Sequence, residues 1–173
     1  MADTIKFLKT RDVKPPTRAN AYDAGIDFYV PELTEDYVRA VKEKNPQLFP
    51  IFIRNVGIEL HPQKRILLPS GFHCQMSSPG RALIAANKSG VSTKNGLVYS
   101  AQVVDFEYQG EIHLGLINTG DSAVTITSGM KILQFVETPV FNSDIEIEEG
   151  KTTNEFYEKT TDRAAKGFGS SDV

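Results

Sequence analysis

Four short stretches of the chain combine glycine with charged or hydroxyl side chains, a composition typical of sites that bind anions or activate water. Asp27 closes the first stretch, DAGID at residues 23–27, in which Gly25 lets another part of the backbone approach closely. The second stretch, NKSGVS at residues 87–92, places a cation, a hydroxyl and a glycine together, and its amides could form a small anion-binding nest. Taken singly, both also fit ordinary turns.

The third stretch, AQVVDFEYQGE at residues 101–111, runs an apolar strand directly into Asp105. A carboxylate at the mouth of a buried strand is a general-base candidate, because desolvation and a fixed direction favour proton abstraction. A solvated strand end is the alternative interpretation. In the fourth stretch, SGMKILQF at residues 128–135, Gly129 turns the chain and Gln134 interrupts an apolar strand, as an ordinary edge residue also would.

A fifth stretch, RAAKGFGSS at residues 163–171, sets one arginine and one phenylalanine among small residues. On composition alone a disordered terminus is the simpler interpretation, since glycine and serine hold their conformation poorly. An ordered state of this stretch therefore requires a ligand or another surface, and Arg163 and Phe168 leave that role open.

Composition limits what these stretches bind. The 173 residues, 40% of them hydrophobic, suffice for one domain with a core. A net charge of −3 argues against nucleic-acid binding, because phosphate backbones require a basic face. With Cys74 as the only cysteine and the three histidines far apart, we expect neither disulfides nor a zinc site. No apolar run approaches the roughly 20 residues that span a bilayer, so we expect a cytoplasmic protein without a membrane partner.

Strand patterns dominate the elements that must position these stretches. In EIHLGLIN at residues 111–118, for example, Ile112, Leu114 and Leu116 occupy every second position, which puts one face into a core. Many short strands with tight turns predict an all-β sandwich, jelly roll or barrel. The six expected strand runs begin at Ile5, Phe52, Lys64, Leu97, Glu111 and Lys131.

Residues 33–46, LTEDYVRAVKEKNP, predict a short amphipathic helix inserted between two strands. Thr34 is its expected N-cap, and Tyr37, Val38 and Val41 are expected to face inward. After about residue 142 the chain holds one short alternating run, and from Lys151 onward polar and small residues prevail. We therefore expect a β domain at residues 1–142 and a C-terminal arm at residues 143–173.

The order and spacing of the five stretches resemble the five motifs of the trimeric deoxyuridine triphosphatase (dUTPase) family. The family pattern runs Ala-Gly-x-Asp, Ser-Gly, Asp-x-x-Tyr-x-Gly, Gly-x-x-x-x-Gln and Arg-x-x-x-Gly-Phe-Gly-Ser. This chain supplies the five motifs at residues 24–27, 89–90, 105–110, 129–134 and 163–170.

The resemblance implies an all-β jelly-roll subunit that forms a homotrimer, with each active site assembled from several chains. It implies that dUTP is hydrolysed to dUMP and pyrophosphate by a water that attacks the α-phosphorus, while the triphosphate holds Mg²⁺. This activity keeps uracil out of DNA and supplies dUMP for thymidylate. Such hydrolysis needs a positioned water and distributed positive charge more than covalent help from the protein.

The resemblance also implies roles for single residues. Asp105 would orient and deprotonate the water, and Asp27 would steady the metal through its waters. Tyr108 would lie under the deoxyribose and exclude a 2′-hydroxyl, and the hairpin around Tyr99 would recognise uracil through backbone groups. The remaining phosphate contacts would come from Lys88, Ser89, Gly90 and Gln134.

The fifth stretch resembles a lid motif over residues 163–171. Arg163 would meet the phosphate charge and act in catalysis, and Phe168 would stack on the uracil. Gly169 and Ser170 would complete the substrate contacts as the backbone wraps around the nucleotide.

Several positions depart from the family pattern. Lys88 stands where the family usually has arginine, which replaces a bidentate fork by a point charge. Asn87 replaces a usual proline, Gln102 and Ala164 replace usual glycines, and Met130 replaces a usual aspartate. Gln102 lies near the expected uracil hairpin, where a side chain can reshape the base pocket.

Two alternatives stay open. A dCTP deaminase-like enzyme shares the superfamily fold, but its glutamate base falls at the position of Gly115, which cannot do acid or base chemistry. A dUTPase-like protein with an added regulatory role could bind a protein partner through residues 33–46. Retention of Asp105, Tyr108 and the fifth stretch favours catalysis over binding alone.

Overall fold

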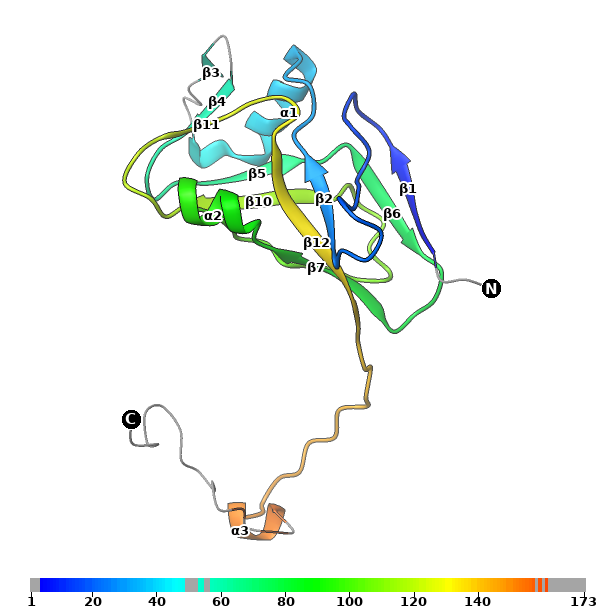
Figure 1. Cartoon of the computed structure of the whole chain (residues 1–173). Helices are drawn as coiled ribbons and strands as arrows, with labels where there is room; N and C mark the ends of the chain where they lie inside the picture. Colours follow the sequence, from blue (N-terminus) through cyan, green and yellow to red (C-terminus); the bar gives the residue numbers. More distant parts are fainter. Residues whose placement is uncertain (1–3, 49–52, 55–56, 158, 160, 162–173) are drawn as a thin grey trace. The chain divides into compact units, whose positions relative to one another are not determined.

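The computed structural model describes residues 4–48, 53–54, 57–157, 159 and 161 (Figure 1). The chain divides into two compact units, Met1–Phe141 and Asn142–Val173. Among the described residues, all strands lie in the first unit, and every paired strand runs antiparallel to its neighbour.

Four small sheets make up the described part of the first unit. This arrangement confirms the predicted all-β jelly-roll fold with one short inserted helix. The strands of each sheet, in the order in which they pair, are as follows: β1 (Ile5–Lys9) with β6 (Phe72–Met76); β5 (Arg65–Pro69), β10 (His113–Asn118) and β8 (Leu97–Tyr99); β11 (Val124–Ile126), β4 (Gly57–Leu60) and β3 (Ile53–Arg54); and β2 (Gly25–Tyr29), β12 (Lys131–Pro139), β7 (Arg81–Ala86) and β9 (Val103–Val104).

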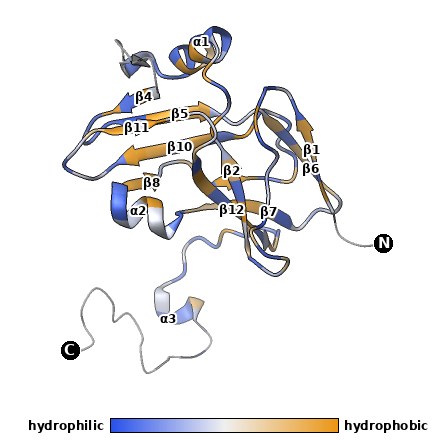
Figure 2. Cartoon of the chain, turned by 45° about the horizontal axis from the view of Figure 1, so that its top comes forward, coloured by the Kyte–Doolittle hydropathy of each residue, from blue (hydrophilic) through white to orange (hydrophobic). Residues whose placement is uncertain are grey.

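Aromatic and aliphatic side chains from different sheets form one core. Phe28 of β2 packs edge to face against Phe7, Phe72 and Phe135, with ring centroids 5.0–6.3 Å apart. In β10 the alternation predicted from the sequence is present, since Leu114 and Leu116 are fully buried. Figure 2 shows the hydrophobic colour concentrated along these strands.

The predicted insert forms helix α1 (Glu35–Lys44), and its N-cap is Thr34, whose Oγ1 accepts a hydrogen bond from the Tyr37 amide at 3.2 Å. Tyr37 and Val41 are buried as expected, whereas Val38 is only half-buried. The Tyr37 hydroxyl donates to the carbonyl of Pro69 at 3.1 Å, which ties the helix to the end of β5.

The C-terminal end of the insert is fixed by a buried asparagine. Asn45 caps α1, and a short 3₁₀ helix, η1 (Pro46–Leu48), follows it. The Asn45 Oδ1 accepts a hydrogen bond from the Leu67 amide at 2.8 Å, and the Asn45 Nδ2 donates to the Leu67 carbonyl at 2.8 Å. Asn45 thus hydrogen-bonds to β5 as a neighbouring strand would, so the insert is part of the packed fold.

The structure contains elements that sequence patterns missed. Strands β2, β7 and β11 were not predicted, because β2 lies in a stretch interpreted as a turn and RALIAA of β7 is rich in alanine. Residues interpreted as a Ser-Gly turn begin a short helix, α2 (Ser89–Asn95). Gly96 ends that helix with φ +67°.

The second unit has little regular structure among its described residues. A single-turn helix, α3 (Thr153–Phe156), begins with a capping box in which Thr152 and Glu155 exchange hydrogen bonds. Ile145 and Ile147, which alternate with acidic residues, are 91% and 81% exposed. In the part of the chain that the structure describes, no helix has the length and apolar character needed to cross a membrane.

Candidate active site

Asp27 lies in the middle of β2 and is only 3% exposed. Its Oδ1 accepts a hydrogen bond from the Lys88 ammonium, and its Oδ2 lies 2.9 Å from the Lys131 ammonium. Burial alone raises the pKa of this carboxyl, but the bonds to the two lysines outweigh it and lower the pKa below its usual range. Asp27 is therefore a buried anion with two cationic partners.

Strand register brings three of the predicted site residues together. Gln134 of β12 lies opposite Asp27 of β2 on one side and opposite Ala86 of β7 on the other. Ala86 precedes Lys88 by two residues. The Gln134 side chain passes over Gly25, where a Cβ would lie 2.1 Å from its Oε1. Gly25 therefore leaves room for the Gln134 side chain, whereas the sequence suggested the close approach of another stretch of backbone.

The Gln134 amide connects to the start of α2. Its Nε2 donates to the carbonyl of Asn87 at 2.8 Å, and the Asn87 Oδ1 accepts from the amide of Tyr99 at 2.9 Å. Asn87, seen in the sequence only as a departure from a family proline, thus ties the Tyr99 strand to Gln134. The position of Asn87 within NKSGVS was the only sign in the sequence that it belongs to the site. Its contacts with Gln134 and Tyr99 form only in the folded chain.

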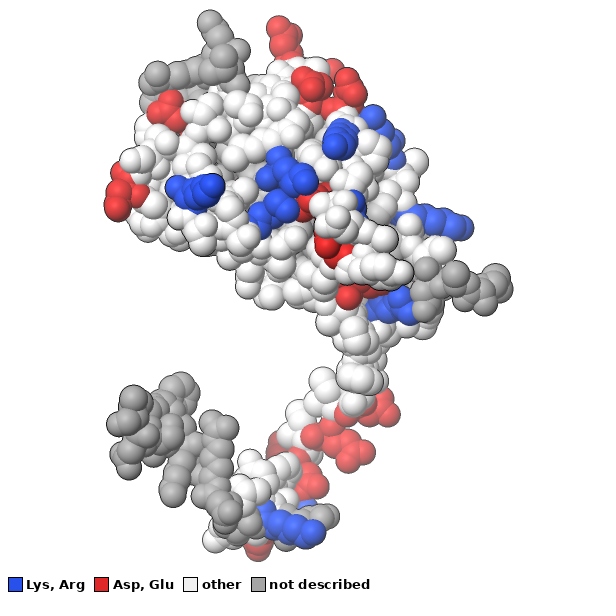
Figure 3. Space-filling view, in the orientation of Figure 1, with Lys and Arg blue, Asp and Glu red and all other residues white. Residues whose placement is uncertain are grey.

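Ser89 and Gly90 form the first turn of α2, with Lys88 as its N-cap. First-turn amides of a helix have no intrahelical acceptor and so point outward. A Cβ on Gly90 would meet no heavy atom within 4 Å, so the space beside this turn is open. Figure 3 shows Lys and Arg side chains gathered on the face that carries β2 and β12, with acidic atoms between them.

Asp105 and Tyr108 lie on a loop that follows β9. Asp105 is exposed, and its carbonyl accepts from the Tyr108 amide at 3.1 Å. The strand before Asp105 is shorter than expected, since β9 has two residues, of which Val104 is buried and Val103 is 56% exposed. The solvated strand end, the alternative interpretation, describes this chain.

The chain does not bring Asp105 next to Lys88. Val104 pairs with Leu83 of β7, whereas Gln134 pairs with Ala86, so about 10 Å of strand separates the two positions. Because β7 and β9 are antiparallel, the chain that leads from β9 to Asp105 runs away from Ala86. Lys88, in contrast, lies beyond Ala86 at the other end of β7. The predicted site residues therefore form two separate groups: one around Asp27, Lys88 and Gln134, and a loop with Asp105 and Tyr108.

The described residues contain no group of three or more His, Cys, Asp or Glu side chains arranged to hold a metal. Both oxygens of Asp27 face ammonium groups, so direct ligation of a cation there is not what these residues are arranged for. These residues would fit a metal carried by a polyphosphate, because the phosphate oxygens would attract the lysines and Asp27 would face the metal through water.

Other predicted positions give mixed results. Arg163, Phe168, Gly169 and Ser170 lie outside the described residues. Gly115 lies in β10, where a Cβ would be 2.8 Å from Ser100 Oγ and 3.0 Å from the Ala101 amide. A side chain at Gly115 would crowd Ser100 and Ala101, which does not favour the carboxylate that a deaminase needs at this position.

Comparison with known proteins identifies the class of this fold and site. The family model dUTPase matches residues 51–172. A protein of gamma-proteobacterium EBAC31A08 named deoxyuridine 5′-triphosphate nucleotidohydrolase is 37% identical over 109 residues, 62% of this chain and 73% of that protein. The chain belongs to the dUTPase family.

Solved structures share the fold. The dUTPase of Staphylococcus bacteriophage 80alpha, solved with dUpNHpp, is 20% identical with a TM-score of 0.73 over 98% of this chain and 99% of that chain. A mutant dUTPase from phage phi11 of S. aureus, described with a structural Mg(II) ion, is 17% identical with a TM-score of 0.65 over 87% and 99% of the two chains. The family match begins after the insert, so Asp27 lies outside the matched segment.

Proposed function

We propose that this chain is a dUTP diphosphatase that hydrolyses dUTP to dUMP and pyrophosphate in cytoplasmic nucleotide metabolism. The observation that carries the proposal is the alignment of Asp27, Gln134 and Lys88 across three adjacent segments, in a chain of the dUTPase family. The curated relatives are named for hydrolysis of this nucleotide.

The group around Asp27 is the proposed triphosphate end of the site. Lys88, with the open first turn at Ser89 and Gly90, supplies positive charge and amide donors to the phosphates, and Gln134 supplies a neutral donor. The substrate is the magnesium complex of dUTP. Asp27 steadies that complex through water once Lys88 turns from the carboxylate to the phosphates.

In the chemical step, Asp105 accepts a proton from water as the water oxygen bonds to the α-phosphorus. The bond from the α-phosphorus to the oxygen that bridges to the β-phosphorus breaks, and pyrophosphate leaves with that electron pair. Positive charge on Lys88 and on the proposed fifth-motif residue Arg163 offsets the charge that develops on the leaving group.

We infer that copies of the chain complete the site, as expected for a homotrimer. Asp105 and Tyr108 lie too far along β9 to reach the phosphates held by the same chain, so the loop of a second copy supplies them. Apolar side chains around this loop support the inference, since Phe106 and Tyr108 are 38% and 42% exposed.

Nucleotide selectivity is proposed to come from backbone and stacking contacts. Tyr108 forms the floor that excludes a 2′-hydroxyl, and the strand at Tyr99, fixed by Asn87, presents backbone groups to uracil. Phe168 stacks on the base in the closed site, and Gly169 and Ser170 complete the contacts of the arm. The packing around Gly115 disfavours a deaminase.

The direct test is to incubate the chain and Mg²⁺ with dUTP, UTP, dTTP and dCTP, and to measure monophosphate and pyrophosphate. We expect turnover of dUTP alone at a high rate, and a loss of at least about 100-fold in kcat for Asp105→Asn, because only the proton acceptor is removed. Unchanged thermal unfolding and nucleotide affinity are the controls. Release of ammonia from dCTP, or near wild-type turnover by Asp105→Asn, would contradict the proposal.

A further inference from the structure

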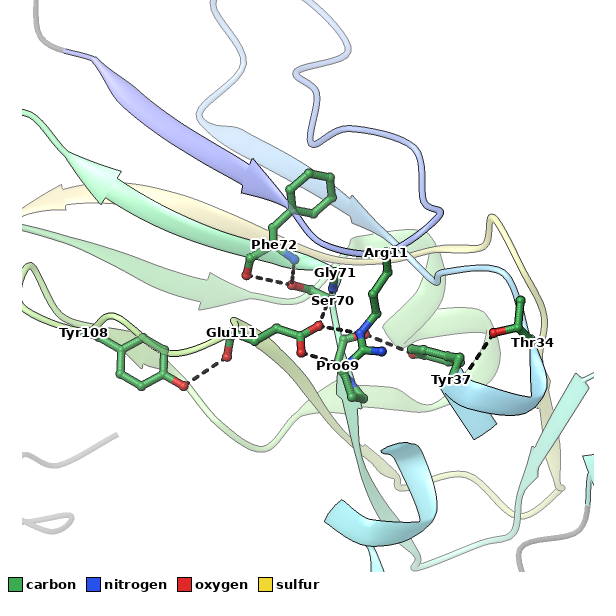
Figure 4. Close-up of polar contacts among 9 residues, drawn as sticks. All are labelled: Arg11, Thr34, Tyr37, Pro69, Ser70, Gly71, Phe72, Tyr108 and Glu111. Atoms are coloured by element: carbon green, nitrogen blue, oxygen red, sulfur yellow. Dashed lines mark hydrogen bonds and ion pairs between the residues drawn. The ribbon is translucent and has the colours of Figure 1, made fainter. Parts of the chain in front are cut away.

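The start of β10 is fixed by one carboxylate that accepts three hydrogen bonds. Glu111 Oε1 accepts from Arg11 Nε at 2.8 Å and from the Gly71 amide at 2.7 Å, and its Oε2 accepts from Arg11 Nη2 at 3.0 Å (Figure 4). The Glu111 side chain is 16% exposed. A bidentate arginine and a backbone amide leave this carboxylate little freedom to move.

Tyr108 is held by the backbone of the same residue. Its hydroxyl donates to the carbonyl of Glu111 at 3.0 Å (Figure 4). Its ring folds back over Gly110. A Cβ on Gly110 would lie 2.4 Å from the Tyr108 hydroxyl, so only glycine permits this fold. The position of the Tyr108 ring therefore depends on where the backbone of Glu111 lies.

Arg11 is held in turn by the helical insert. Its guanidinium carbon lies 5.7 Å from the centre of the Tyr37 ring, within the range of a cation–π contact, and the Tyr37 hydroxyl bonds to Pro69. Gly71, at φ +81°, brings its backbone against Arg11, where a Cβ would lie 3.0 Å from the Arg11 Cβ. Contacts thus run from α1 through Arg11 and Glu111 to Tyr108.

We propose that Arg11, Glu111 and Tyr37 are positioning residues that fix where the Tyr108 ring lies. Through them the helical insert contributes to discrimination between deoxyribose and ribose. The proposal rests on the proposed role of Tyr108 as the floor of the sugar site. To exclude one hydroxyl group, the Tyr108 ring must be placed to within a fraction of an ångström. The Glu111 carboxylate, which accepts three hydrogen bonds, provides that accuracy. The insert lies outside all five motifs, yet Tyr37 is its contact with this network.

The test compares kcat/KM for dUTP and for UTP in Glu111→Gln, which keeps the shape of the side chain and removes its charge. We expect the ratio of the two values to fall by at least about threefold, and more in Arg11→Lys, which loses the fork but keeps the charge. Glu137→Gln is the matched control, because Glu137 pairs with Arg81 at 2.9 Å with similar exposure. In Glu137→Gln the ratio of kcat/KM for dUTP to kcat/KM for UTP should stay at the wild-type value.

A double-mutant cycle separates positioning from a general loss of stability. In a Tyr108→Ala background, Glu111→Gln should change the ratio no further, because the ring that it positions is gone. An unchanged ratio in Glu111→Gln and Arg11→Lys, an equal change in Glu137→Gln, or full additivity with Tyr108→Ala would overturn the proposal. Failure of the wild-type chain to hydrolyse dUTP would instead contradict the proposed function, so the two failures are distinguishable.

Discussion

Asp27 and Glu111 are both largely buried carboxylates, but they are held by different kinds of cation. Asp27 is held by two lysines, Lys88 and Lys131. Glu111 is held by the fork of Arg11 and by a backbone amide. An ammonium group is a point charge on a flexible stem, whereas a guanidinium binds a carboxylate in one plane through two parallel hydrogen bonds.

The difference matches what each region is proposed to do. Lysines around Asp27 can turn from the carboxylate to an incoming phosphate without disturbing the backbone of β2. The Arg11 fork cannot turn without breaking two hydrogen bonds and moving off Tyr37. We therefore interpret the Asp27 group as an adaptable phosphate site and the Glu111 group as a rigid support for Tyr108.

Within this comparison of the two carboxylates, the largest expected effect comes from removing Lys88, the lysine proposed to exchange partners. Lys88→Met should lower kcat/KM for dUTP by about 10- to 100-fold, because a hydrogen bond to a charged group contributes about 1.5–3 kcal/mol. The fold should persist, since Lys131 still pairs with Asp27. Steady-state kinetics check the loss, with urea unfolding as the check on the fold.

Lys131→Met is the matched control for that prediction. Lys131 contacts the other oxygen of Asp27 and also lies 5.8 Å from the Tyr29 ring, but it is not a residue of the α2 turn. Its loss should reduce kcat/KM less than the loss of Lys88. Equal losses in the two variants would show that the lysines act only through total charge, and the contrast with Arg11 would then lose its basis.

A smaller effect, on stability, is expected at the other anchor of the insert. Asn45→Ala leaves both backbone groups of Leu67 without their side-chain partner, and we expect the free energy of unfolding to fall by about 2 kcal/mol. The dUTP to UTP ratio should change little, because Tyr37 and Arg11 keep their contacts.

Arg39→Ala is the control on the same helix. Arg39 is 67% exposed and pairs with Asp36 within the helix, so its loss should change the unfolding free energy by less than about 0.5 kcal/mol. Urea unfolding at one fixed protein concentration measures both variants, since assembly shifts apparent stability. A loss of selectivity in Asn45→Ala would extend the positioning role from Tyr37 to the whole insert.

Local sequence patterns predicted the features whose causes are local. The Thr34 cap, the inward face at Tyr37 and Val41, and the alternation in β10 each depend on neighbouring residues, and each is present. The meeting of Asp27, Lys88 and Gln134 was expected only through the family resemblance. Its physical cause is the register of β2, β12 and β7, which no single stretch contains.

Contacts between distant residues could not be predicted from patterns. Arg11 and Glu111 are 100 residues apart, and neither lies in a stretch whose composition indicates its partner. Asn45 was given no role from the sequence, and Asn87 was noted only as a departure from a motif, but their side-chain amides bond to the backbones of Leu67 and Tyr99. The sequence left the exposure of Asp105 open because it does not show how short β9 is.

The smallest expected effect concerns the pH dependence of stability. Burial raises the pKa of Glu111, but the Arg11 and Gly71 hydrogen bonds and the nearby His113 outweigh it, so the folded pKa lies below the usual value. A carboxyl with a lowered folded pKa stabilises the fold above its unfolded pKa of about 4.3, and this contribution is lost as the pH falls through the folded pKa. Acid should therefore weaken the Glu111 group.

Glu111→Gln isolates this contribution, because glutamine imitates the protonated carboxyl in shape and charge. At pH 7 the variant should unfold with about 1 kcal/mol less free energy than the wild type, the difference between a charged and a neutral hydrogen bond. The gap should close as the pH falls below about 4. The Asp27 group titrates in both proteins, so its contribution cancels. Urea unfolding from pH 7 to pH 3 measures the gap, and a gap that stays constant would show that the Arg11 fork stabilises the loop without depending on the charge of Glu111.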